Sequence, residues 1–223
     1  MTMLIPFSER VPKPWKNGGG STTEIAVVPP DAGFEDFDWR VSLATIAADG
    51  PFSVFPGVER TLALLDGHGL TLEIDGEPTL VSRTEPVAAF DGESEVTAKL
   101  NRGPTTDFNV MTRLDRCYHR FGRRSLDGPS KFVARADVTV LFLAEGESLE
   151  LASDDKRVNL VRYDAVLLDP GTTWQLDADQ GTIFVVDIHY YDDEQDLEDE
   201  DIDYDAEGEE DDDHDGHGRP LRE

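Results

Sequence analysis

Two segments of the chain hold residue types that could bind a small molecule. The first is Trp15–Glu24, WKNGGGSTTE, and the second is Gly50–Arg60, GPFSVFPGVER. A third segment, Asp107–Arg113, adds an acid, an amide and another arginine. Arg60 stands out because a guanidinium offers a planar fork of donors that matches a carboxylate. No spacing of a nucleophile and a base is recognisable, so these segments predict anion binding rather than nucleophilic catalysis.

The second segment resembles the first motif of metal-binding cupins, H-x-H-x(3–4)-E-x(6)-G. When this motif is aligned on Pro56-Gly57 and Gly67, its two histidine positions fall on Ser53 and Phe55. Its glutamate position falls on Arg60. Imidazole and carboxylate groups are the ligands that a divalent metal needs there, and nearly all are missing. We therefore expect no metal and no cofactor.

An arginine in place of the glutamate reverses the charge preference of such a site. The formal net charge of the chain is −28, and a cation inside a barrel needs a buried acid or an anionic ligand as its partner. Two interpretations stay open at this point. Arg60 binds a ligand, or it forms a structural ion pair with Glu24 or Asp107.

Three motifs in a fixed order, WKNGGGSTTEIA, GPFSVFPGVERTLALLDGHG and DFNVMTR, resemble the HutD/Ves family of bicupin proteins. The resemblance runs from about Leu4 to Ile188. It implies an all-β bicupin fold and a pocket for a small anionic catabolite such as N-formylglutamate, formate or urocanate. The family is associated with histidine utilisation, where it would sense or modulate the pathway, and it brings no established catalytic activity.

The resemblance also implies candidate pocket residues. Arg60 matches the pocket arginine of the family. Lys16 and Asn17 would add a cation and an amide to the same carboxylate, or they form a glycine-rich turn that holds the N-terminal strand. Asn109 would orient an amide or formyl group, or satisfy backbone groups at a strand end. Ser53, at a vacated histidine position, would donate its hydroxyl to the ligand.

The other residues with chemical potential have simpler explanations. Cys117 and His119 lie two positions apart but lack the further ligands of a metal site. His68 falls in a predicted hairpin turn. His214 and His217 lie in a run of aspartates that is better explained as a solvated charged segment.

The elements that must position these residues are predicted to be strands. Short runs alternate apolar and polar residues or are apolar throughout, namely 39–46, 60–65, 70–74, 138–143, 157–163 and 182–188. Asp-Gly and Pro-Gly pairs mark turns between them. The best helical candidate is Met111–Phe121, which is short and polar. Many short strands with frequent turns predict a sandwich or a barrel.

A shift of the sequence by 78–79 residues brings two copies of one pattern into register. Gly67–Leu72 falls on Gly146–Leu151 at a shift of 79, and Phe108–Val110 falls on Val186–Ile188 at a shift of 78. The repeat predicts two similar barrels in tandem.

The negative charge is concentrated at the C-terminal end. From Asp192 to Asp215, 17 of 24 residues are acidic, and residues 192–223 carry −16 of the net charge. Such a segment has too few apolar residues to offset the entropy cost of ordering. We expect a disordered tail at 192–223 after a body at 1–191, with a first barrel at about 1–115 and a second at about 130–191. The body carries −12, which excludes the basic surface that nucleic-acid binding needs.

The sequence shows neither an apolar run of the roughly 18–20 residues that span a membrane nor a signal peptide. Its one cysteine fits a reducing compartment. We expect a cytoplasmic, metal-free bicupin of two jelly-roll barrels that binds a small anionic metabolite without nucleic-acid or membrane partners, with a homodimer as one possible assembly. Catalysis is the less favoured function. Two alternatives stay open: a metal-independent enzyme with Glu24 or Asp107 as general base, and a stress-related interaction protein whose acidic tail binds partners.

Overall fold

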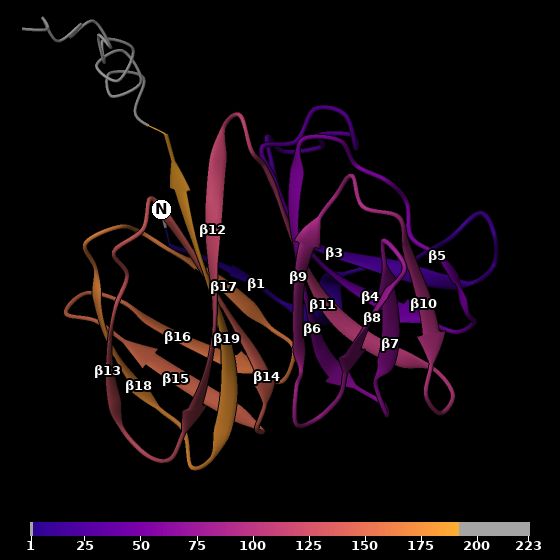
Figure 1. Ribbon diagram of the computed structural model, residues 1–223. Coiled ribbons are helices and arrows are strands. Elements are labelled where there is room, and N and C mark those ends of the chain that lie inside the picture. Colours follow the sequence, from indigo (N-terminus) through magenta and orange to yellow (C-terminus); the bar gives the residue numbers. More distant parts are fainter. Residues whose placement is uncertain (1, 192–223) are drawn as a thin grey trace, which may run out of the picture. The chain divides into compact units, whose positions relative to one another are not determined.

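All six apolar runs form β-strands in the computed structural model, which describes residues 2–191 (Figure 1). Apart from strands, this part of the chain holds one short helical turn, η1 (Phe7–Glu9). None of its helices is long and apolar enough to cross a membrane. The all-β prediction is therefore confirmed. The predicted disordered tail lies outside the described residues.

The first half of the chain forms two antiparallel sheets that enclose one interior, part of which is an apolar core. Leu62 and Leu64 of one sheet pack there against Leu70 and Leu72 of the other. The six-stranded sheet has the order β2 (Lys13–Pro14), β3 (Gly20–Val28), β4 (Trp39–Ile46), β11 (Thr105–Arg113), β6 (Val58–Asp66) and β9 (Val87–Asp91). The four-stranded sheet has the order β5 (Gly50–Pro51), β10 (Val96–Leu100), β7 (Leu70–Ile74) and β8 (Glu77–Val81).

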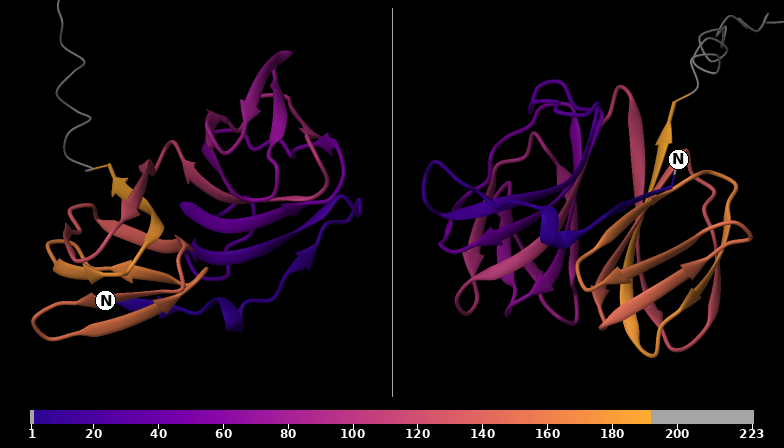
Figure 2. Two further views of the ribbon diagram at one scale, coloured as in Figure 1. Left: turned by 90° about the horizontal axis from the view of Figure 1, so that it is seen from below. Right: turned by 180° about the vertical axis from the view of Figure 1, so that it is seen from behind.

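The second half repeats this arrangement, with Leu141 and Leu143 packed against Leu149 and Leu151. Its five-stranded sheet has the order β1 (Met3–Ile5), β17 (Ala165–Leu168), β14 (Val138–Glu145), β19 (Gly181–Tyr190) and β12 (Cys117–Leu126). Its four-stranded sheet has the order β13 (Ser130–Val133), β18 (Thr173–Asp177), β15 (Ser148–Ala152) and β16 (Arg157–Val161). The N-terminal strand β1 thus pairs with β17 of the second barrel, as Figure 2 shows.

A third apolar cluster joins the two barrels through the outer faces of their larger sheets. In β6, Leu62 points into the first barrel, whereas Ala63 points toward the second. Both faces of this part of the strand are buried, so Leu62–Leu65 is an uninterrupted apolar run. Phe108 lies at the centre of the interface, with its ring 4.9 Å from Phe142 and 5.4 Å from Phe184.

Matching irregularities in the two barrels support the repeat. Gly67 and Gly146 both have a positive φ, 95° and 111°, which favours glycine. A Cβ on either would lie 2.8 Å from a backbone oxygen, that of Pro104 in the first barrel and that of Gln180 in the second. Each barrel also has a register shift between two paired strands, β6 and β11 in the first barrel and β14 and β19 in the second.

The same irregularities correct the alignment of the last strands. Asp107 pairs with Leu64 just past the first register shift, and Ile183 pairs with Leu143 just past the second. Asp107 therefore corresponds to Ile183, a shift of 76 residues rather than 78. The sequence pattern missed this because alternating strands match themselves equally well after a slip of two residues.

The helical candidate Met111–Phe121 is wrong. This stretch is the hairpin in which β11 ends at Arg113 and β12 begins at Cys117, with the Arg116 amide donating to the Arg113 carbonyl at 3.0 Å. Pairing of β11 with two neighbouring strands and of β12 with β19 satisfies the backbone here. Long-range pairing overrides the weak local preference of a short polar segment.

Candidate functional site

The interior face of the six-stranded sheet carries polar and charged side chains beside its apolar ones. In antiparallel sheets, residues directly opposite one another share a face. The register places Arg60 opposite Met111, and Met111 opposite Arg40. One row further along lie Leu62, Asn109, Ser42 and Glu24, and the next row includes Asp107. We refer to six of these residues as the polar cluster: Glu24, Arg40, Ser42, Arg60, Asp107 and Asn109.

Arg60 lies among aromatic rings near one end of the first barrel. Its residue is 8% exposed, and its guanidinium carbon lies 5.3, 5.4 and 4.9 Å from the ring centres of Phe52, Phe55 and Phe90. Nη1 donates to the Ser53 carbonyl at 3.2 Å, while Nε has no acceptor within residues 2–191. Burial lowers the pKa of Arg60 to about 10, so the side chain keeps its charge at neutral pH.

Asp107 is fully buried in the same interior. Its Oδ2 accepts a hydrogen bond from Asn109 Nδ2 at 2.6 Å, and its Oδ1 has no donor in the described part of the chain. Burial raises the pKa of Asp107 to about 7, against the opposing effects of the Asn109 hydrogen bond and the charge of Arg60. The cluster therefore contains a carboxyl group close to its titration point at neutral pH.

Arg40 is a second buried arginine, 7% exposed. Its Nη2 lies 2.8 Å from Glu24 Oε2, and its guanidinium carbon lies 4.5 Å from the ring centre of Phe34. Of the two acids considered as ion-pair partners of Arg60, Glu24 pairs with Arg40 instead, and Asp107 is the acid whose charge acts on Arg60. Burial lowers the pKa of Arg40, and Glu24 opposes that shift.

Sequence reasoning missed Arg40 although a signal was present. The run WRVSLATI predicts a buried strand, and the arginine at its second position is its single charged residue. A buried charge needs a partner, so this exception could have marked a functional position.

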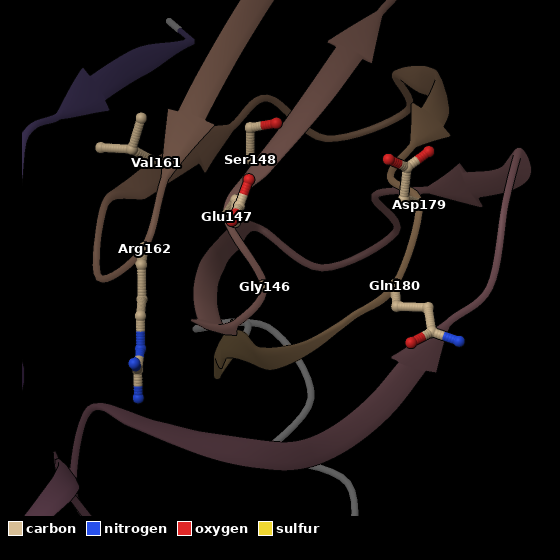
Figure 3. A pocket seen from close by; sticks show the side chains of 7 residues that line it. All are labelled: Gly146, Glu147, Ser148, Val161, Arg162, Asp179 and Gln180. Atoms are coloured by element: carbon tan, nitrogen blue, oxygen red, sulfur yellow. The ribbon is translucent and has the colours of Figure 1, made fainter.

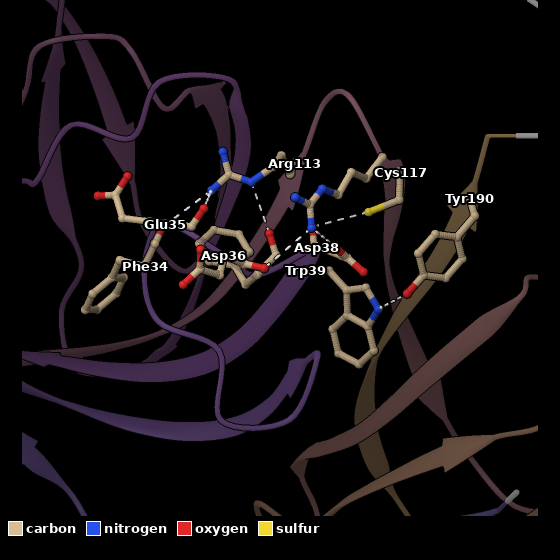
Figure 4. Close-up of polar contacts among 10 residues, drawn as sticks. Phe34, Glu35, Asp36, Asp38, Trp39, Arg113, Cys117 and Tyr190 are labelled. Atoms are coloured by element: carbon tan, nitrogen blue, oxygen red, sulfur yellow. Dashed lines mark hydrogen bonds and ion pairs between the residues drawn. The ribbon is translucent and has the colours of Figure 1, made fainter. Parts of the chain in front are cut away.

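The loop at residues 29–38 places Phe34 beside the cluster. Arg113 donates to three backbone carbonyls of this loop at 3.0–3.5 Å, and Arg116 forms an ion pair with Asp38 (Figure 4). These contacts tie the loop to the β11–β12 hairpin. The position of the Phe34 ring over Arg40 therefore depends on β11, the strand that also carries Asp107 and Asn109.

The other sequence-predicted residues fall in two places. Ser53 is exposed and contacts Arg60 through its backbone carbonyl, not its hydroxyl. Lys16 and Asn17 are exposed in the turn between β2 and β3, where Asn17 Oδ1 accepts a hydrogen bond from the Gly19 amide at 3.0 Å.

The turn with Lys16 and Asn17 lies far along the sheet from Arg60. β3 begins at Gly20 opposite Ile46, six residues along β4 from Arg40. At about 3.3 Å per residue, this separation is about 20 Å. The structure therefore brings Arg60 and Asn109 together, while Asn17 makes the turn contact expected of a structural role.

The second barrel has no comparable cluster at corresponding positions. By the register described above, Arg60 corresponds to Thr139, Asp107 to Ile183 and Asn109 to Val185. Ile183 and Val185 belong to the buried apolar core of the second barrel. The second barrel keeps a single hydrogen-bonded pair on this face, Thr139 with Asp187 at 2.6 Å, at the positions of Arg60 and Met111. The buried arginines are therefore a feature of the first barrel.

The donor set of the cluster does not fit a divalent metal. Arg60 occupies the position where the cupin pattern has a glutamate, and a guanidinium donates hydrogen bonds but offers no lone pair for a metal. Across residues 2–191, no three His, Cys, Asp or Glu side chains gather in a way that could hold an ion.

His119 has a structural environment. Its Nε2 and Nδ1 lie 2.8 Å from the hydroxyls of Thr61 and Thr112. Glu59 Oε2 lies 3.7 Å from the same Nδ1. Burial lowers the pKa of His119 to about 4, so the ring is neutral at physiological pH and links β12 to the strands behind the polar cluster.

Two cavities lie away from the cluster. An open depression of about 870 Å³ at the hairpin end of the second barrel is lined by Gly146, Glu147, Ser148, Val161, Arg162, Asp179 and Gln180 (Figure 3). A smaller one of about 60 Å³ includes Arg83 and Arg123. Size alone favours the first, but its side chains are exposed. Buried charges with unpaired atoms are the stronger sign of a site. Arg10 also has them, at Nε and Nη1, but it is only partly buried, whereas Arg60 and Asp107 are both less than 9% exposed and each has an unpaired atom in the same barrel interior. We therefore place the candidate site at the polar cluster.

Sequence comparison finds one matching family model and several relatives. The family model, described as HutD, matches residues 8–185. An uncharacterized 21.2 kDa protein in the hutC 3′ region of Pseudomonas putida is 37% identical over 157 residues, covering 70% of this chain and 80% of that protein. Protein Ves of Citrobacter koseri is 46% identical over 105 residues, which are 46% of this chain and 53% of Ves. The match thus spans about half the length of Ves.

Solved structures share the fold over nearly their whole length. A conserved protein of unknown function from Pseudomonas aeruginosa PAO1 superposes with a TM-score of 0.78 at 28% identity, over 85% of this chain and 99% of that one. HutD from Pseudomonas fluorescens SBW25, in a formate condition, gives 0.73 at 28% identity, over 86% and 100%. Ylba from E. coli, at 11% identity and a TM-score of 0.62, shares the fold alone.

Proposed function

Because this chain belongs to the HutD family and folds as an all-β bicupin, we propose that its first barrel binds a small carboxylate metabolite at the polar cluster. The observation that carries the proposal is Arg60, a buried guanidinium whose Nε has no acceptor among the described residues. A carboxylate supplies the acceptors that such a group lacks. Asn109 lies one row further along the sheet and would orient a polar group of the ligand.

The aromatic surroundings of Arg60 favour a bound anion over a structural ion pair. A buried arginine that serves stability would have its donors satisfied, because an unpaired buried charge is costly. Three rings instead exclude water around the guanidinium. A hydrogen bond between an ionised carboxylate and Arg60 would be strengthened by this low local dielectric.

The relatives suggest the source of the ligand. One lies in the hutC 3′ region of Pseudomonas putida, and another is HutD in a formate condition. We therefore propose that the ligand is an intermediate or product of histidine breakdown, such as N-formylglutamate, formate or urocanate. The protein would act in the cytoplasm as a sensor or modulator of that pathway.

Calorimetric titration with these three compounds tests the proposal. Arg60→Gln should weaken binding about tenfold to a hundredfold, since a hydrogen bond to a charged group contributes about 1.5–3 kcal/mol. Arg10→Gln is the matched control, because Arg10 also has donors without an acceptor, Nε and Nη1, and burial also lowers its pKa to about 10, but it lies in the field of Asp164 of the second barrel. Equal binding by wild type and Arg60→Gln, or no binding of any of the three compounds, would refute the assignment.

One observation keeps an enzymatic function in view as the second candidate. Asp107 has a pKa raised to about 7 and lies in the field of Arg60, the combination that a general acid or base needs at neutral pH. Turnover of the same three compounds by metal-free protein, abolished in Asp107→Asn, would establish catalysis. If wild-type protein binds these compounds without converting them, binding is the only one of the two functions that remains.

A further inference from the structure

One edge of the larger sheet in the second barrel has no neighbouring strand among residues 2–191. This edge is β12, whose ladder within that range is formed with β19 (Figure 1). Arg120, Gly122, Arg123 and Ser125 are exposed along it, and a Cβ added at Gly122 would meet nothing within 4 Å. An edge of this kind presents backbone donors and acceptors with which a further strand can pair.

The first barrel shows what the fold places at this position. β12 corresponds to β4, because each pairs with the last strand of its barrel, β4 with β11 and β12 with β19. On its other side β4 pairs with β3, and all of its residues are buried except the half-buried Thr45. The second barrel adds β1 at the opposite edge, beside β17. Within residues 2–191, β3 therefore has no counterpart beside β12.

The strand at this position carries an acid in the first barrel. Arg120 corresponds to Arg40, because it lies opposite Asp187, which stands at the position of Met111. Arg40 forms an ion pair with Glu24 of β3 at 2.8 Å. Arg120 forms no ion pair or hydrogen bond with another side chain in the described part of the chain. Its position in the fold is thus one at which an added strand would supply the acid.

The β12 edge is positively charged in a body that is acidic overall. It carries three arginines within residues 120–124, whereas the body as a whole carries −12. Arg123 lies 3.6 Å from Glu145, and Arg124 donates to the Lys131 carbonyl at 3.2 Å. Arg120 is therefore the arginine of this edge with its full charge open to an incoming group.

These charges decide which kind of strand the edge accepts. Pairing β12 with the β12 of a second copy would bring arginines together, and charged side chains on an edge prevent such self-association. An acidic strand instead brings opposite charges together. Because side chains alternate between the two faces of a strand, acids at every second position would lie on the same face as Arg120 and Arg124.

We propose that the free edge of β12 binds an extended acidic segment of a partner protein, which adds to the sheet as a strand at the position that β3 occupies in the first barrel. Main-chain hydrogen bonds to β12 hold the segment, and its acids select it. One of them pairs with Arg120 as Glu24 pairs with Arg40. A segment of about six residues, or about 20 Å, covers the exposed stretch from Arg120 to Ser125.

Two eight-residue peptides test the inference on the full chain by calorimetric titration at low ionic strength. One alternates glutamate with threonine, which favours extended backbone, and the other has glutamine in place of each glutamate. Wild-type protein should bind the glutamate peptide at least tenfold more tightly. Arg120→Glu should weaken that binding at least fivefold. Arg102→Glu makes the same change of charge at an exposed residue between β10 and β11, and should leave it unchanged.

Amide hydrogen exchange distinguishes strand addition from loose ionic attraction. The glutamate peptide should slow exchange at least tenfold at amides within residues 120–125. The control is β16, an edge strand of the same barrel whose Arg157 is already paired with Glu150 at 3.0 Å, and its exchange should not change. Unaltered exchange in β19 would show that Arg120→Glu is folded, so a loss of peptide binding would reflect the charge.

Three results would overturn the inference. The first is equal affinity for the two peptides, or no binding of either. The second is protection of β12 that rises with protein concentration in the absence of peptide, because a second copy would then occupy the edge. The third is a set of cross-links from β12 to residues 192–223 of the same chain without peptide binding, which would assign the edge to this chain's own acidic segment.

Discussion

Asp107→Asn tests whether the first barrel holds a carboxyl group that is protonated near neutral pH. Burial raises the pKa of Asp107 from 3.8 to about 7 in the folded chain, while Asn109 and Arg60 limit the rise. The unfolded chain therefore releases this proton near pH 4, and the folded chain keeps it until about pH 7. The stability that Asp107 contributes is fully present below pH 4 and is lost as the pH rises toward 7.

The size of the effect follows from the shift. A pKa difference of about 3 units corresponds to about 4 kcal/mol, at about 1.36 kcal/mol per unit. Asparagine keeps the shape of the side chain and has no proton to lose. The free energy of unfolding of Asp107→Asn, relative to wild type, should therefore increase by about 4 kcal/mol between pH 4 and pH 7.5.

Urea unfolding followed by tryptophan fluorescence at several pH values measures this difference. Asp187→Asn is a control in the second barrel, where Asp187 accepts a hydrogen bond from Thr139 at 2.6 Å. Comparing each variant with wild type at the same pH cancels the titration of the many other acids. A difference between Asp107→Asn and wild type that stays constant from pH 4 to 7.5 would refute the reasoning, because Asp107 would then titrate alike in both states.

Two further predictions concern stability. Burial lowers the pKa of His119 from 6.5 to about 4, so about 3 kcal/mol of stability is lost as the pH falls from about 6.5 to 4. In His119→Asn, the free energy of unfolding in urea should therefore change less over this pH range than in wild type. An unchanged pH dependence would contradict the prediction. Gly69→Ala should lower the free energy of unfolding by more than 2 kcal/mol, because φ is +81° and the new Cβ would lie 2.1 Å from the Val81 carbonyl oxygen. Gly76→Ala, at φ +87° with open space around the Cβ, gives the cost of backbone strain alone, and an equal loss in both variants would show that the close contact contributes nothing.

Strand positions and the repeat were predictable because they depend on local patterns. Alternating or continuous apolar runs bury one or both faces of a strand, and Asp-Gly turns end them. Arg60 was predictable for a different reason, since it breaks a motif at a position where the motif needs an acid. The helix proposed at Met111–Phe121 failed because a short polar stretch carries little local preference.

The sequence by itself determined that the chain is an all-β tandem repeat of the HutD type with an unusual arginine in its first barrel. Only the tertiary structure decided which residues surround that arginine, because neighbours in a sheet are chosen by strand register and not by distance along the chain. Arg40 and Arg60 both lie opposite Met111 of a strand that begins at Thr105. Lys16 and Asn17, as prominent in sequence, lie in the turn before β3, near the other end of the sheet. A slip of two residues leaves the alternation of a strand intact but moves every cross-strand partner, so the polar cluster exists only once the strands are paired.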